Sequence, residues 1–207
     1  MYRIGFIDDD NSLNDVYAKR LSRKDIELCF VDDCDTMQDV VSWILDAGIK
    51  CMIVDYQLTN QYNFKGTELV AYINAELPDL QCVILTNYKD TGISENLVIK
   101  NLFYERDIFE QGMDSEEFQE FVNTLKQATV IFDNRLKRHL EEYEQLKAQK
   151  DNETIRAIDE ERMISIYKVL RAYGEVDDIP AELLTSSVSK QMSSILQSLN
   201  ELIDKTE

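Results

Sequence analysis

Short apolar segments alternate with amphipathic segments over the first half of the chain. Four compact apolar segments are typical of buried strands and lie at residues 2–7, 26–31, 51–54 and 82–85. Stretches with apolar residues at helical spacing separate them, at residues 13–21, 37–45 and 66–77. Strands that alternate with helices of about 10–15 residues predict an α/β, doubly wound parallel sheet with helices on both faces.

The fifth strand of this sheet has two candidate positions. The sequence Leu102-Phe-Tyr-Glu-Arg106 is the preferred strand and ends in a basic residue. The segment 97–99 is the alternative, and it would place Lys100 at the strand end instead. The alternative would confine the preceding helix to residues 89–95, and in either alignment that helix is short or irregular.

Beyond Gly112 the strand patterns stop and helical patterns continue. Residues 114–150 contain no proline or glycine, and apolar or neutral residues recur at alternating steps of four and three: Phe118, Val122, Leu125, Thr129, Phe132, Leu136, His139, Tyr143 and Leu146. This heptad seam predicts one long helix of the coiled-coil type. Two further helices are predicted at 154–173 and from about 178 to 204. The chain therefore divides into a domain of residues 1–126 and an all-helical module of residues 127–207.

The charge and the apolar content of the chain argue against nucleic-acid and membrane partners. The 207 residues include 22 Lys and Arg against 40 Asp and Glu, a net charge of −18, and nucleic-acid binding depends on basic side chains. No apolar run reaches the roughly 18 residues that a membrane-spanning helix needs, and the start of the sequence lacks the pattern of a secretory signal. Four cysteines without CxxC spacing are typical of reduced thiols. We expect a cytoplasmic protein with no nucleic-acid and no membrane partner.

Carboxylates follow two of the predicted strands. Asp8, Asp9 and Asp10 follow the first strand, Asp55 ends the third, and Thr86 ends the fourth. Because the carboxyl ends of parallel strands meet at one edge, these side chains are expected in a common crevice. Mg²⁺ prefers oxygen ligands and would relieve the repulsion between the carboxylates. The alternative is that the first three acidic residues cap the next helix.

These segments resemble the receiver domain of two-component response regulators. The resemblance covers about residues 1–126 and rests on Arg3-Ile-Gly-Phe-Ile-Asp-Asp-Asp10, Met52-Ile-Val-Asp-Tyr-Gln-Leu58, Gly66 before a helix, and Val83-Ile-Leu-Thr-Asn87. It implies a flavodoxin-like, five-stranded parallel sheet of order 2-1-3-4-5. It also implies a signalling protein that is not an enzyme, apart from catalysing its own phosphorylation and dephosphorylation.

The resemblance assigns roles to individual residues of this sequence. It implies that Asp55 is the phospho-acceptor and receives a phosphoryl group from a sensor histidine kinase. Asp8 and Asp9 would hold Mg²⁺ together with Asp55, and the backbone carbonyl of Gln57 would supply a further oxygen. Thr86 would hydrogen-bond a phosphoryl oxygen.

The basic position departs from the family pattern. The family carries a lysine at the end of the fifth strand, where this sequence offers Arg106 or, in the alternative alignment, Lys100. Arginine still pairs with phosphate, although its geometry differs from that of lysine. If neither residue reaches the crevice, the switching of the domain would be impaired.

The helical module leaves several functions open. A seam of this length needs other helices or a second chain to cover it, so we expect a homodimer or a docked protein partner. The interpretation we favour is a response regulator with a helical output that does not bind DNA. The alternatives are a phosphorylation-independent scaffold, and a phosphate sink or relay that uses Asp55 and the single histidine, His139.

Overall fold

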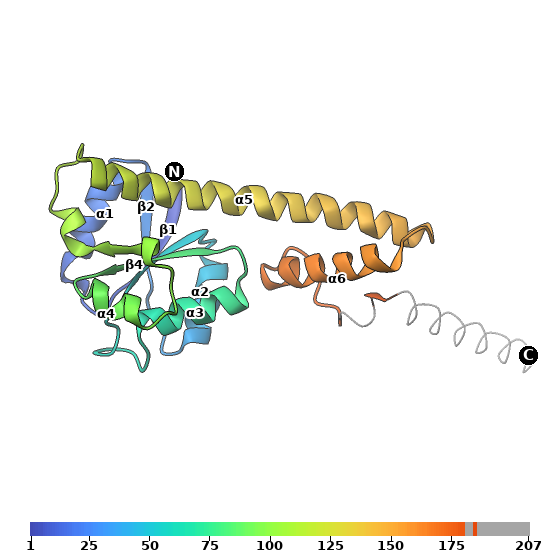
Figure 1. Ribbon diagram of the computed structural model, residues 1–207, viewed down its shortest axis with the longest axis horizontal. Helices are drawn as coiled ribbons and strands as arrows, with labels where there is room; N and C mark the ends of the chain where they lie inside the picture. Colours follow the sequence, from blue (N-terminus) through green and yellow to red (C-terminus); the bar gives the residue numbers. More distant parts are fainter. Residues whose placement is uncertain (181–183, 186–207) are drawn as a thin grey trace, which may run out of the picture. The chain divides into compact units, whose positions relative to one another are not determined.

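The computed structural model describes residues 1–180 and 184–185 (Figure 1). The chain forms two compact units, one from Met1 to Arg135 and one that begins at Leu136. The helix α5 (Glu116–Asp151) contributes to both units. The third helix predicted from about residue 178 lies mostly outside the described residues.

A five-stranded parallel sheet forms the centre of the first unit. Its order is β2-β1-β3-β4-β5, which confirms the predicted doubly wound, flavodoxin-like fold. The strands are β1 (Tyr2–Ile7), β2 (Ile26–Phe30), β3 (Cys51–Asp55), β4 (Gln81–Thr86) and β5 (Phe103–Glu105). All five residues of β3 are buried, as a strand covered on both faces requires.

Helices cover both faces of this sheet. They are α1 (Asn14–Ser22), α2 (Met37–Asp46), α3 (Gly66–Glu76), α4 (Lys89–Ser94) and the first part of α5. Side chains of α1 and α5 share one core with the strands, while α2 and α3 pack together on the other side (Figure 1). Gly5 in β1 leaves the space that Trp43 of α2 and Met52 of β3 fill, because a Cβ there would lie 2.2 Å from the Met52 sulfur.

The structure decides between the two positions for the fifth strand. Phe103 pairs with Ile84 and Glu105 with Thr86, so the strand lies within the preferred segment and the alternative at 97–99 is wrong. The preceding helix α4 has only six residues, which confirms that it is short. The strand therefore ends immediately before Arg106.

The long helix and one further helix follow the last strand in the sequence. The predicted helix over 114–150 is confirmed as α5, and the one over 154–173 as α6 (Ala157–Ala172). Every position of the heptad seam is buried or half-buried. Seam residues up to Leu125 pack in the core of the sheet, whereas Tyr143 and Leu146 pack with α6. No described helix has the length and apolar character that crossing a membrane would require.

Candidate functional site

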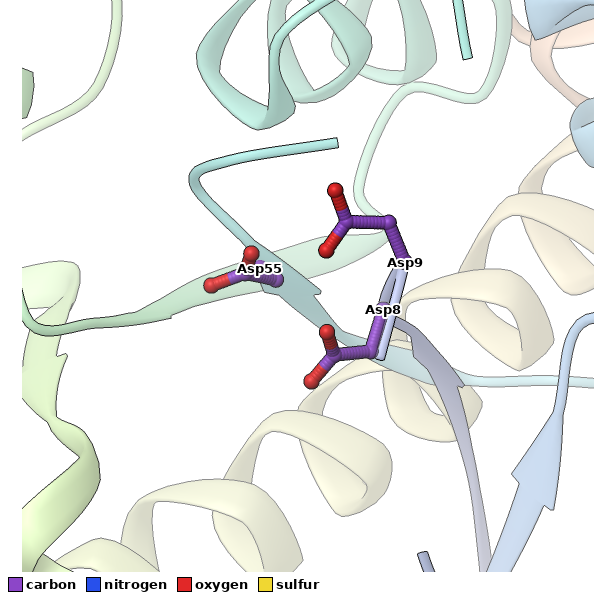
Figure 2. Close-up of side chains that lie close together, drawn as sticks. All are labelled: Asp8, Asp9 and Asp55. Atoms are coloured by element: carbon purple, nitrogen blue, oxygen red, sulfur yellow. The ribbon is translucent and has the colours of Figure 1, made fainter. Parts of the chain in front are cut away.

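Three carboxylates gather at the carboxyl edge of the sheet. Asp8 and Asp9 directly follow β1, and Asp55 is the last residue of β3, the neighbouring strand. One carboxylate oxygen from each residue lies within 4.8 Å of the others (Figure 2). Asp8 and Asp55 are buried and Asp9 is half-buried. The topology therefore brings together acidic residues that lie more than forty positions apart in the sequence.

Arg106 completes this cluster. It follows β5 directly, at the start of the 3-10 helix η3 (Arg106–Phe109). One of its nitrogens, Nη2, lies 2.7 Å from Asp8 Oδ2 and 2.8 Å from Asp55 Oδ1. The side chain is 17% exposed, so most of it is removed from water. Arg106 thus neutralises part of the charge that the buried carboxylates bring.

Lys100, the alternative basic residue, lies elsewhere. It begins the 3-10 helix η2 (Lys100–Leu102), which precedes the amino end of β5. The carboxylates gather at the opposite, carboxyl ends of the strands. Lys100 is exposed and lines a surface hollow with Lys89 and Tyr104.

Backbone N–H groups fix the orientation of all three carboxylates. Asp8 accepts a hydrogen bond from the N–H of Asp10, Asp55 from that of Gln57, and Asp9 from that of Asn60, at 3.0, 3.0 and 3.1 Å. The Asn60 contact ties the loop after β3 to the loop after β1. The second carboxylate oxygen of Asp8 and that of Asp55 both contact Arg106.

Asp10 does not join the cluster. Its carboxylate caps the 3-10 helix η1 (Asn11–Leu13) by accepting the N–H of Ser12 at 2.9 Å. That hydrogen bond also lowers the pKa of Asp10. The capping interpretation of the acidic triplet therefore describes Asp10, and the interpretation as a cluster describes Asp8 and Asp9.

Burial sets the protonation of the two inner carboxylates. Loss of water raises the pKa of Asp55 to about 6, although the hydrogen bond and charge of Arg106 oppose the rise. Loss of water also raises the pKa of Asp8, against the Asp10 N–H and Arg106. At neutral pH the Asp55 carboxylate is therefore mainly ionised, yet it is far more basic than an exposed aspartate.

Thr86 ends β4, next to the strand that carries Asp55. Asp55 pairs with Leu85, so Thr86 lies one residue further toward the carboxyl edge. Its side chain is buried, and its hydroxyl oxygen accepts the N–H of Tyr88 at 2.9 Å. Tyr88 itself is 51% exposed, at the rim of this edge.

Gly66 brings helix α3 against the backbone of Asp55. A Cβ on Gly66 would lie 1.9 Å from the Asp55 carbonyl oxygen, and the Gly66 N–H donates to the carbonyl of Tyr56 at 3.0 Å. The glycine that the sequence places before a helix is therefore required by close contact with the chain at Asp55.

A second polar cluster beside the site has no counterpart in the sequence prediction. Glu95 follows α4 and accepts hydrogen bonds from Tyr56 at 2.8 Å, from Lys65 at 2.7 Å and from Thr67. These contacts join the end of α4 to the loop that follows Asp55 and to the first turn of α3. The donors lie 28 to 39 residues from Glu95 in the sequence, so no local pattern could reveal them.

The donor set of the cluster fits a hard divalent cation. Three carboxylates at the carboxyl ends of two adjacent strands offer oxygen ligands close together, which is the chemistry that Mg²⁺ prefers. The backbone N–H of Gln57 donates a hydrogen bond to the Asp55 carboxylate. The backbone carbonyl of Gln57 remains a predicted ligand. Asp8, Asp9 and Asp55 are therefore the residues that could hold the ion.

Solved structures with the same fold are receiver domains. The chain is 16% identical to the signal receiver domain of an HD domain-containing protein from Pseudomonas fluorescens, with a TM-score of 0.50 over 66% of this chain and 93% of the other. A two-component transcriptional regulator from Clostridium phytofermentans gives 16% identity and a TM-score of 0.49, over 64% and 98%. A chain in a complex of a histidine kinase with a response regulator gives 16% and 0.45, over 60% and 98%.

The N-terminal part of the chain thus has the fold of response-regulator receiver domains. The similarity to the Pseudomonas fluorescens domain covers 66% of the chain and leaves the helical module unidentified. No protein-family model matches the sequence, and no curated protein matches it.

Proposed function

We propose that residues 1–126 are a receiver domain in which Asp55 accepts a phosphoryl group from a sensor histidine kinase. The observation that supports this proposal is the cluster of Asp8, Asp9 and Asp55 at the carboxyl edge of a receiver fold, with Arg106 beside it. The helical module, from residue 127 on, is the output part in this proposal.

The chemistry proposed for Asp55 is a nucleophilic substitution at phosphorus. A carboxylate oxygen of Asp55 forms the new P–O bond while the P–N bond to the donor histidine breaks, and the imidazole nitrogen leaves with the electron pair. The product is an acyl phosphate. The pKa of about 6 keeps Asp55 ionised at neutral pH, so the nucleophile is available without a separate base.

Other residues of the edge would bind the phosphoryl group. Arg106 would pair with a phosphoryl oxygen, and the Thr86 hydroxyl would donate to another. Asp8, Asp9, Asp55 and the Gln57 carbonyl would hold Mg²⁺, which neutralises charge on the transferring oxygens when it is bound. For the Thr86 hydroxyl to turn toward the phosphate, its contact with the Tyr88 N–H must change.

Labelling of single variants tests this assignment. The protein is incubated with acetyl phosphate and Mg²⁺, and the intact mass is measured. We expect the wild-type chain to gain one phosphoryl group, Asp55→Asn to gain none, and Asp9→Asn to gain little. Asp10→Asn is the matched control, because Asp10 neighbours the cluster but caps η1. Undiminished labelling of Asp55→Asn would exclude Asp55 as the acceptor.

The output would pass through the helices. Because α5 runs without interruption from the sheet into the second unit, a change at the sheet can reach the helical module without crossing a linker. We propose that phosphorylation alters self-association or docking of a protein partner there. Light scattering with and without acetyl phosphate tests this step, and an unchanged mass in both conditions would exclude phosphorylation-dependent dimerisation.

A phosphorylation-independent scaffold is the second candidate. The specific observation in its favour is that an arginine, rather than the family's lysine, is paired with both buried carboxylates. Beryllofluoride with Mg²⁺ distinguishes the two, since it mimics a phosphoryl group on aspartate. An NMR spectrum that does not change at Thr86 and Tyr88 would favour the scaffold.

A further inference from the structure

Arg106 contacts Asp8 and Asp55 through a single atom. Nη2 lies 2.7 Å from one carboxylate oxygen and 2.8 Å from the other, so this nitrogen sits between two of the three acidic groups. These are the same carboxylates that offer oxygens to a cation. The guanidinium is therefore already in the place where a cation would draw the two groups together.

We propose that Arg106 is an internal counter-ion that competes with the divalent cation, so that the ion binds tightly only when the guanidinium leaves Asp8 or Asp55. This inference rests on the proposed function, because it concerns the affinity of the same site for Mg²⁺. It assigns to Arg106 a role in the resting protein that is separate from any contact with a phosphoryl group.

The spacing of the oxygens supports competition. Mg²⁺ holds its ligands at about 2.0–2.1 Å, so two of its ligands lie at most about 4.2 Å apart. One oxygen from each of Asp8, Asp9 and Asp55 lies within 4.8 Å of the others, so the three groups are close enough to share one ion. Nη2 of Arg106 already contacts one oxygen of Asp8 and one of Asp55, at 2.7 and 2.8 Å, so an ion that took these two oxygens would have to replace the guanidinium.

The charge of Arg106 and its burial both oppose the binding of a divalent ion. The guanidinium is always protonated, so it cannot reduce its repulsion of a divalent ion by losing a proton. Its side chain is 17% exposed, and the carboxylates of Asp8 and Asp55 are 1% and 5% exposed. Water and salt screen buried charges poorly, so the guanidinium of Arg106 would strongly repel a divalent ion bound at these carboxylates.

The same contacts stabilise the protein without a metal ion. Two buried carboxylates that lack a counter-ion would repel each other and lose their hydration without compensation. Arg106 provides that compensation in the resting protein. Removing its charge should therefore weaken the metal-free fold and, at the same time, open the cluster to the divalent ion.

Calorimetric titration of the full chain with Mn²⁺ tests the proposal directly. The measurement is made at pH 8, where Asp55 is ionised. We expect Arg106→Gln, which keeps much of the size but not the charge, to bind Mn²⁺ at least tenfold more tightly than the wild type. Arg3→Gln is the matched control, because it removes one positive charge from a half-exposed pair with Glu27 in β2. Its affinity should stay within about twofold of the wild type.

A second measurement reports the same competition through stability. Addition of Mn²⁺ should raise the melting temperature of Arg106→Gln more than that of the wild type, since a ligand stabilises a fold according to its affinity. If Arg106→Gln does not fold, Arg106→Met takes its place, because methionine also removes the charge and should likewise give tighter binding than the wild type.

The outcomes separate this inference from the proposed function. Mn²⁺ binding that is equal or weaker in the folded Arg106 variants than in the wild type overturns the competition and leaves the cation site intact. Absence of Mn²⁺ binding in every variant overturns both. A gain in Arg3→Gln equal to that in Arg106→Gln would assign the effect to net charge and would also overturn the inference.

Discussion

The two halves of α5 lie in very different surroundings. In the first half, Phe118, Phe121, Val122, Leu125 and Ala128 enter a large core that includes strands β1, β3 and β4. In the second half, Tyr143 and Leu146 belong to a small core whose other buried members all come from α6. One regular heptad pattern therefore packs against the sheet in the first half and against a single helix in the second. The seam identifies which face of the helix is buried, but it does not identify what buries it.

The largest loss of stability is expected from mutations in the first half of α5. Phe121→Ala should cost about 3–5 kcal/mol, because a fully buried ring is removed from a close-packed core. Urea unfolding followed by the fluorescence of Trp43 is the appropriate measurement, since this single tryptophan lies in α2 of the first unit. Ile131→Ala is the control on the same helix. Its side chain is 40% exposed, and the change should stay within about 0.5 kcal/mol. A similar loss in both variants would contradict the burial pattern.

The second half should show a smaller and more local effect. Leu170→Ala removes a fully buried side chain of α6 and should cost about 2–4 kcal/mol. Because the core of the second unit is small, this loss should abolish hydrogen-exchange protection over α6. Trp43 fluorescence should report unchanged stability of the first unit. Loss of protection throughout β1 and β3 as well would show that the two units fold as one.

The two units should also differ in their response to pH. Burial raises the pKa of Asp55 from 3.8 to about 6, so the folded state holds a proton more tightly than the unfolded state. The stability of the first unit should therefore fall as the pH rises from about 4 to 6, by at most about 3 kcal/mol. Asp55→Asn should remove most of this slope and should be more stable than the wild type at pH 7.

The control for this pH effect lies in the second unit. There Arg162 lowers the pKa of Glu142, so the stabilisation from this carboxylate is present at neutral pH and is lost in acid. Hydrogen exchange in α6 should therefore not slow between pH 7 and pH 5 after correction for the intrinsic rate. A stability of the first unit that is independent of pH from 4 to 7 would contradict the burial of a titrating Asp55.

The smallest predicted effects come from the ion pairs along α5. Lys50 pairs with Asp133 in the first unit, and Arg162 pairs with Glu142 through two hydrogen bonds in the second. All four side chains are exposed by more than a third, so a double-mutant cycle should give each pair only about 0.2–1 kcal/mol. A coupling above about 2 kcal/mol in either pair would mean that the helix is held mainly by charge.

Much of the fold could be predicted from the sequence because each buried strand is visible as a short apolar segment. The strands β1, β3 and β4 are mainly apolar, and each has a polar residue at its carboxyl end, which the sheet brings to the same edge. Asp8, Asp9, Asp55 and Thr86 could therefore be assigned to one edge of the sheet from the strand pattern alone. The extent of α5 was equally predictable, since the seam runs unbroken.

The parts that could not be predicted depend on contacts between distant residues. Arg106 could be nominated from its place after β5, but its simultaneous contact with Asp8 depends on where its side chain crosses the sheet edge. The tie between Asn60 and Asp9 uses a backbone N–H, which any residue except proline carries. In the Glu95 cluster, the donors to the acidic side chain come from another loop. The spacing of apolar residues along the sequence therefore could not predict the cluster.

Gly66 has a consequence for engineering this protein. The downstream end of the loop between Asp55 and Gly66 is fixed, because any side chain at position 66 would collide with the Asp55 carbonyl. A graft between residues 57 and 65 must therefore keep the glycine at the junction. It must also keep the N–H groups that hold Asp55 and Asp9 and replace the buried side chains of Leu58, Tyr62 and Phe64 with apolar ones. Grafts that move the junction by one residue would displace the Asp55 backbone itself. Loop chimeras with other proteins of this fold should therefore be joined at the glycine rather than at the first residue that differs.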